Sequence, residues 1–178
     1  MRFRFGTAVI LCVLWVVPAT AVEDVFAVAQ QAAQEGRYRD VVDILTELLV
    51  TPDLEPAAEV VAYSNRGIAY SLMKAYGLAR KDLESAVAIM PDHALSLNQL
   101  GILAEQVEQD YVRAREYYGR AAKTGFAAAQ VNQARLLKEG LGGPVALAEA
   151  RRLLDAAAET GYSMAFTPLG LMYVNGEG

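Results

Sequence analysis

The phrase AAKTGFAAA occupies residues 121–129 and returns as AAETGYSMA at residues 157–165, a spacing of 36 residues. Other residues recur at the same distance, and Gly140 is followed by Gly176. A fixed period of about 20 to 50 residues is typical of solenoids, in which each unit buries its apolar faces only against its neighbours. The repetition therefore predicts the architecture, and it leaves open what that architecture binds.

Each copy of the phrase has the composition of a corner between two helices. Gly125 and Gly161 are expected just past a helix end, where the backbone turns left-handed and glycine adopts that conformation without strain. Phe126 and Tyr162 follow, and we expect them to fold back on the helix that they leave. The alanines that come next are small enough for close packing of the following helix.

Helical spacing extends over the rest of the chain. From Val22 onward apolar residues recur at helical intervals, and β-branched alternation is nearly absent. Breakers divide this text into segments of helix length, at Gly36, Thr51–Pro52, Pro56, 90–92, 109–110, Gly125, 140–144, Gly161 and Gly176. The sequence predicts nine helices joined by short turns, and the fold class is all-α.

One stretch carries the pattern of a close helix pair. Small residues stand where two helix axes would cross, large residues fill the space between, and a proline ends the second helix; in order these are Tyr63, Gly67, Tyr70, Ala79, Leu83, Ala86 and Pro91. The arrangement resembles the tetratricopeptide repeat (TPR), and a weaker copy covers residues 22–53.

From about Leu97 the text resembles the Sel1-like repeat, a longer relative of the TPR. The phrases that carry this likeness are LGILAEQ (100–106), VRAREYYGRAAKTGF (112–126), EARRLLDAAAETGY (149–162) and LGLMYVNGEG (169–178). The two resemblances imply a right-handed superhelical solenoid of antiparallel helix pairs. Residues 22–93 would form two TPR-like repeats, and residues 94–178 would form Sel1-like repeats with the last one incomplete.

The final repeat departs from the family pattern at two points. Pro168 falls in the first turn or two of the last helix, unless that helix starts late with Thr167 as its N-cap. In the family, the residues that follow NGEG (175–178) begin a partner helix. We therefore expect these residues to be part of a longer protein.

The N-terminus has the order of a secretory signal. Arg2 and Arg4 precede the apolar run of residues 8–17, and the small-x-small site Ala-Thr-Ala follows at residues 19–21. We predict a signal peptide over residues 1–21 and export to a bacterial periplasm or the exterior; an uncleaved N-terminal anchor is the alternative. The only cysteine, Cys12, lies within this segment, so disulfide-stapled folds are excluded for the mature chain.

The charge balance limits the class of partner. The chain has a formal net charge of −5, and removal of residues 1–21 leaves 14 basic and 21 acidic residues, a charge of −7. Such a balance argues against nucleic acid, and against an anionic membrane surface unless the signal segment stays attached.

No motif of the sequence points to catalysis. His93, the only histidine, is expected in a surface turn where Asp92 can cap the next helix, and it has no second histidine or cysteine as a partner for metal binding. The loop GLGGP (140–144) lacks the Lys-Ser/Thr of a phosphate loop and is expected as a turn, with Pro144 opening the next helix. The pair Tyr117–Tyr118 is expected to pack in the core or to be half-buried. We predict no cofactor, no metal and no small-molecule substrate.

The TPR resemblance implies that the first helix of each pair lines a concave surface. Carried over, that surface comprises Phe26, Gln30, Val61, Ser64, Ile68, Ser71, Leu72, Asn98, Ile102, Glu105, Val131, Arg135 and Lys138. Apolar anchors mixed with hydrogen-bonding groups suit a peptide or a partner helix laid in the groove. Asn65 matches one position of the family's clamp for C-terminal carboxylates, but Phe26, Leu95 and Gln99 stand where its basic residues belong.

The sequence therefore predicts a non-catalytic protein-interaction scaffold in the cell envelope. The substitutions Ile68→Asp and Ile102→Asp are expected to abolish binding of the partner without unfolding the array. The alternative is the scaffold portion of a longer exported protein whose enzymatic or wall-binding domain follows residue 178.

Overall fold

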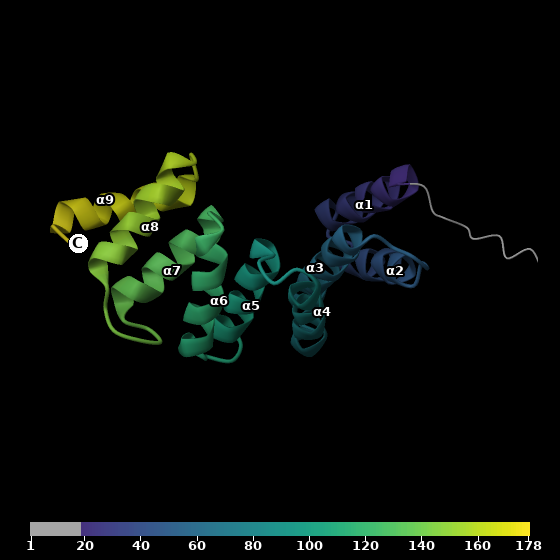
Figure 1. The fold of residues 1–178 in the computed structure, drawn as a ribbon, viewed down its shortest axis with the longest axis horizontal. Helices are drawn as coiled ribbons and strands as arrows, with labels where there is room; N and C mark the ends of the chain where they lie inside the picture. The colour runs from purple at the N-terminus through teal and green to yellow at the C-terminus, as the bar shows by residue number, and fades with distance from the viewer. Residues whose placement is uncertain (1–18) are drawn as a thin grey trace, which may run out of the picture.

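The computed structural model describes residues 19–178, and the signal segment predicted over residues 1–21 lies almost wholly outside them. Nine α-helices and one 3-10 turn occupy the described residues (Figure 1): α1 Ala19–Gln34, α2 Tyr38–Leu49, α3 Pro56–Leu72, α4 Tyr76–Ile89, α5 Ala94–Gln106, α6 Tyr111–Lys123, α7 Ala127–Glu139, α8 Leu147–Glu159, η1 Ser163–Ala165 and α9 Phe166–Asn175. The described part contains no strand, and the all-α prediction is confirmed. None of these helices is both long and apolar enough to cross a membrane.

The helices stack in chain order. Each of α1, α3, α5 and α7 packs against the helix that follows it, and each second helix packs against the next pair. The buried residues, mostly alanine and leucine, form clusters that follow one another along the stack. This arrangement confirms a solenoid of helix pairs, since each pair buries one face within itself and another against its neighbour.

Both copies of the repeated phrase turn at the predicted glycine. Gly125 and Gly161 have φ of 86° and 80°, directly after α6 and α8. The threonine before each glycine donates its hydroxyl to the carbonyl three residues earlier, at 2.7 Å in both corners. The hydroxyl is a second donor to a carbonyl that also accepts a backbone N–H, from Thr124 in the first corner and from Tyr162 in the second. Phe126 packs against the buried cluster beneath the corner.

Two glycines mark the closest helix crossings. A Cβ at Gly67 would lie 2.9 Å from Leu83 Cγ, and one at Gly101 would lie 2.5 Å from Tyr118 Cε1. Glycine is therefore required at both positions by the close approach of a large side chain. Tyr118 is fully buried and Tyr117 is half-buried, as the sequence predicted.

The last helix begins earlier than a cap at Thr167 would require. A 3-10 turn, η1, runs directly into α9, whose N-cap is Ala165 and whose first residue is Phe166. Pro168 is thus the third residue of α9, within the first turn, where backbone N–H groups have no intrahelical acceptor. The proline is accommodated there because the donor that it lacks is not needed.

The prediction that Pro144 opens the eighth helix is wrong, because α8 begins three residues later, at Leu147. Residues 140–146 instead pack across the start of α6. Arg115 donates from Nη1 to the carbonyl of Pro144 at 3.0 Å. A Cβ at Gly142 would lie 2.1 Å from the carbonyl oxygen of Tyr111, so this loop approaches the α6 backbone at a position only glycine permits.

The array is curved. The first helices of successive pairs, α1, α3, α5 and α7, contact one another, whereas α2, α4, α6 and α8 make no comparable contacts among themselves. Helices on the inside of a curve approach more closely than those on the outside. We call the side formed by the first helices the inner face and the side formed by the second helices the outer face. Figure 1 shows the stack as an elongated arc from α1 to α9.

Candidate protein-binding site

The inner face has a hollow between α1 and α3. Its volume is about 480 Å³. Most of the side chains in its walls are apolar and come from α1 and α3, and α2 adds Tyr38 and Val41: Phe26, Ala29, Gln30, Ala33, Tyr38, Val41, Val61, Asn65, Ile68, Ala69 and Leu72. Val61 is 38% exposed and Leu72 is 55% exposed. On α3 the spacing of Val61, Ile68 and Leu72 places all three on one face of the helix. The predicted residues Phe26, Gln30, Ile68 and Leu72 are therefore brought together here.

A second hollow continues the first along the array. It lies between α3 and α5, has a volume of about 380 Å³, and is lined by Ile68, Ser71, Leu72, Tyr76, Gln99, Ile102, Leu103, Gln106 and Val107. Ile68 and Leu72 line both hollows. The two hollows thus form one surface over three successive first helices. We call the side chains Phe26, Val61, Ile68, Leu72 and Ile102 the inner strip.

The prediction that Ser64 and Asn98 belong to the partner-binding surface is wrong. Ser64 is 1% exposed and Asn98 is 5% exposed, so neither is presented to a partner. They occupy equivalent positions on α3 and α5, and Asn98 lies on the flank of α5 that faces α7. Asn98 shows what this flank does, because its Oδ1 accepts a hydrogen bond of 3.0 Å from Asn132 of α7. The curvature that brings first helices together buries this flank.

Glu105 and Arg135 serve an internal network. Glu105 accepts a hydrogen bond of 2.9 Å from the hydroxyl of the buried Tyr118 and pairs with Arg135. Arg135 also pairs with Glu139 at 3.2 Å. Burial, and then the Glu105 carboxylate, raise the pKa of Tyr118, which therefore stays a neutral donor. These charges hold α5, α6 and α7 together.

The remaining predicted residues of α7 also have partners inside the chain. Val131 is half-buried and packs against the core cluster around Ala134. Lys138 pairs with Glu177 at 2.7 Å, which ties α7 to the segment after α9. The predicted surface therefore divides into an apolar part on α1, α3 and α5 and a polar part on α5 and α7 whose charges are already paired.

The sequence prediction missed several residues of the hollows. Gln99 and Gln106 flank Ile102 at spacings of three and four residues, so the helical period would have placed them on the same face. Tyr76 begins α4 and Val107 follows α5, and only the three-dimensional packing brings these element ends to the inner face.

His93 lies at the N-cap position of α5, the place expected for Asp92. Its Nδ1 is 2.9 Å from the hydroxyl of Ser96, the third residue of the helix, and burial lowers its pKa. Among residues 19–178 no group of three or more His, Cys, Asp or Glu side chains gathers as a metal site.

Comparisons with known proteins identify the fold. No family model matches this chain, and no curated protein matches it. Among solved structures, the crystal structure of a Sel1 repeat protein from Oxalobacter formigenes is similar, with a TM-score of 0.66 and 24% sequence identity. The match covers 85% of this chain and 62% of that chain, so this chain spans less than two thirds of the protein it resembles. The chain has the fold of a Sel1 repeat protein.

Proposed function

We propose that the chain is a non-catalytic scaffold that holds a protein partner against the inner strip. The observation that carries the proposal is the continuity of the two hollows, since Ile68 and Leu72 line both and three successive first helices contribute to them. A concave apolar surface that crosses several repeats suits a long, narrow partner better than a small compact ligand. The fold shared with a Sel1 repeat protein supports a scaffold role.

The chemistry of the hollows describes the partner. Apolar side chains form most of the walls, and the side-chain amides of Gln30, Asn65, Gln99 and Gln106 line them as well. Amides both donate and accept hydrogen bonds, so they match the polar groups of a peptide. We therefore propose an extended peptide or an amphipathic helix whose apolar side chains enter the hollows.

The place of action is part of the proposal. The signal pattern of residues 1–21 supports export, and we propose that the scaffold works in the bacterial cell envelope. N-terminal sequencing of the protein recovered from the periplasmic fraction of its own cell should begin at Val22. Recovery from the cytoplasm with residues 1–21 intact would contradict export.

Binding is tested with peptides selected from a random display library on residues 22–178. The double variant Val61→Asp/Leu72→Asp places two charges on exposed positions of the inner strip. Its matched control, Leu78→Asp/Val112→Asp, places the same charges on the second helices, where the side chains are 51% and 69% exposed. These sites are preferable to Ile68 and Ile102, because Ile102 packs against a buried cluster.

The strip variant should bind the selected peptides at least about tenfold more weakly, because a desolvated charge opposes apolar burial. The control variant should bind within about twofold of the wild type. Circular dichroism should show the same helix content in all three proteins. Equal affinities for the strip variant and the wild type would contradict the proposed function.

A further inference from the structure

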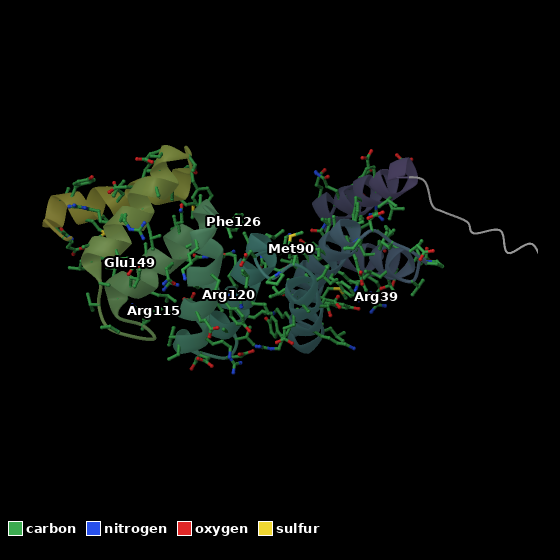
Figure 2. All side chains as sticks on the ribbon, in the orientation of Figure 1. Arg39, Met90, Arg115, Arg120, Phe126 and Glu149 are labelled. Atoms are coloured by element: carbon green, nitrogen blue, oxygen red, sulfur yellow. The ribbon has the colours of Figure 1, made fainter. Side chains whose placement is uncertain are left out.

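A separate cleft opens on the outer face, between α6 and α8. Its volume is about 630 Å³, with α6 on one wall, α8 on the other, and side chains of α7 at its base. Figure 2 shows Arg115, Arg120 and Glu149 around this cleft, well away from α1 and α3, which form the first inner hollow. The curvature of the array accounts for the cleft, because second helices diverge where first helices converge.

The walls of the cleft carry an excess of positive charge. Arg115, Arg120 and Lys123 of α6 and Arg152 of α8 line it, against the carboxylates of Glu116 and Glu149. None of these four cations forms an ion pair within residues 19–178. Arg37, Arg66, Arg80, Arg113 and Arg135 pair with carboxylates. Arg39, Lys74, Lys81 and Arg151 also form no ion pair within the described residues, but none of them lines the cleft. The cleft concentrates uncompensated cations in a chain whose formal charge is −5.

Two of the cations are held in place by backbone carbonyls. Arg115 donates to the carbonyl of Pro144 at 3.0 Å, and Arg120 donates to that of Pro91 at 2.8 Å. Each carbonyl engages one nitrogen of a guanidinium that has five N–H groups. The remaining N–H groups are available to an anion, and the side chains are already positioned, which reduces the entropy cost of binding.

The base of the cleft contains two buried amides with unused hydrogen-bonding capacity. Gln130 and Gln133 are each 7% exposed, and the Oε1 atom of each is enclosed without a hydrogen-bond partner. Such an atom destabilises the fold relative to one that has a hydrogen-bond partner. Gly119 adjoins one of them, since a Cβ built there would lie 3.4 Å from Gln133 Nε2. The Nε2 groups of the two amides form no hydrogen bond within residues 19–178 and are not enclosed, so they point to a ligand that supplies acceptor oxygens.

The spacing of the cations selects an elongated ligand. Arg115 and Lys123 are eight residues apart on α6, which corresponds to about 12 Å along the helix axis. One phosphate or carboxylate is too small to reach both ends. An extended peptide advances about 3.3 Å per residue and covers that distance in about four residues. A peptide also supplies backbone carbonyls as acceptors for the two amide Nε2 groups.

We propose that the α6–α8 cleft is a second protein-binding site, which takes an acidic segment of about four residues in extended conformation. Carboxylates of the segment pair with the cations of α6 and with Arg152, and its backbone carbonyls accept hydrogen bonds from the Nε2 groups of Gln130 and Gln133. This site is independent of the inner strip, so each can be present without the other.

The probe is a fluorescein-labelled peptide of four Glu-Ser repeats, blocked at both ends and measured by fluorescence anisotropy. The variant Lys123→Gln/Arg152→Gln neutralises two exposed cations that make no hydrogen bond to the described residues. The control, Arg39→Gln/Lys81→Gln, makes the same charge change at exposed positions of α2 and α4. We expect about fivefold or greater weakening for the cleft variant and less than about twofold for the control.

A second variant separates binding from folding. Gln133→Met keeps the volume of the side chain and removes its polar atoms. It should raise the melting temperature, because a buried unsatisfied oxygen is lost, and it should weaken the Glu-Ser peptide. If Gln133 served the fold alone, the variant would lower the melting temperature and leave the peptide affinity unchanged.

Two outcomes would overturn the acidic-peptide site. Equal weakening by the cleft and control variants would show that the probe responds to overall charge alone. Displacement of the probe by equimolar citrate or inorganic phosphate would show that isolated anions suffice. Because Val61→Asp/Leu72→Asp leaves the cleft untouched, failure of one site is distinguishable from failure of the other.

Discussion

The inner strip lies on the concave side of the curved array, and the α6–α8 cleft lies on its convex side. On the inside, first helices converge, polar residues such as Asn98 are consumed in contacts between helices, and mainly apolar side chains are left at the surface. On the outside, α6 and α8 diverge, and their charged side chains surround a polar cleft. Stacking similar units along a curve therefore produces two chemically different surfaces without any special element.

The largest expected effect comes from breaking the packing that both surfaces depend on. Gly101→Ala places a Cβ against the ring of Tyr118, at a distance of 2.5 Å if nothing moves. We expect the free energy of unfolding to fall by about 2–3 kcal/mol, measured by urea denaturation. If Gly101→Ala changed the α5–α6 packing and still bound the library-selected peptide and the Glu-Ser peptide as tightly as the wild type, neither surface would depend on that packing.

Gly170→Ala is the matched control for that substitution. Gly170 also lies within a helix, α9, but a Cβ there meets nothing within 4 Å. The same chemical change should raise the free energy of unfolding by about 0.5–1 kcal/mol, because glycine is the poorer helix former. Destabilisation by both variants would contradict the close-packing explanation.

The next largest effect is a difference between the two surfaces in how salt changes their affinity for peptides. Raising sodium chloride from 50 to 500 mM should weaken the Glu-Ser peptide at the cleft about tenfold, since exposed ion pairs are screened. Peptides selected for the inner strip should change by less than about twofold, because apolar burial is not weakened by this salt. Isothermal titration at both salt concentrations measures the difference, and equal salt dependence would show that the surfaces do not differ in kind.

The smallest expected effect concerns His93, between the two surfaces at the start of α5. Burial lowers its pKa in the folded chain, so the unfolded chain binds the proton more readily. This contribution to stability is therefore present above the ordinary histidine pKa of about 6.5 and is lost as pH falls below it. Melting temperatures of the wild type and His93→Asn should converge or cross as pH falls from 7.5 to 5.5. A constant difference would exclude titration of His93.

The helices and their corners could be predicted because they depend on neighbours in the sequence. A corner requires a glycine with φ near 80° directly after a helix. A close helix pair requires a small residue opposite a large one, and both residues lie within the same repeat. The start of α9 was less predictable, because η1 extends the helical path through Phe166 and leaves Thr167 inside the helix.

The surfaces were harder to predict because they depend on the angle between repeats. On an isolated helix Ser64 and Asn98 have the positions of groove residues, but both are buried in the array, and Asn98 is hydrogen-bonded to Asn132 of the next first helix. The outer cleft joins α6 to α8 across α7, and in the sequence its cations are indistinguishable from those of a solvated helix face. Distances between repeats are not encoded in any one repeat.

The proposed function requires that the inner strip receives the library-selected peptide and that the surface around Leu78 of α4 does not. Cysteine variants test it directly, because the only native cysteine, Cys12, is absent from residues 22–178. Leu72→Cys lies on the strip and Leu78→Cys lies on α4, at 55% and 51% exposure in the native leucines. A saturating library-selected peptide should slow alkylation of the thiol at 72 about tenfold and leave that at 78 unchanged. Unchanged alkylation at 72, or equal protection at both positions, would contradict the account.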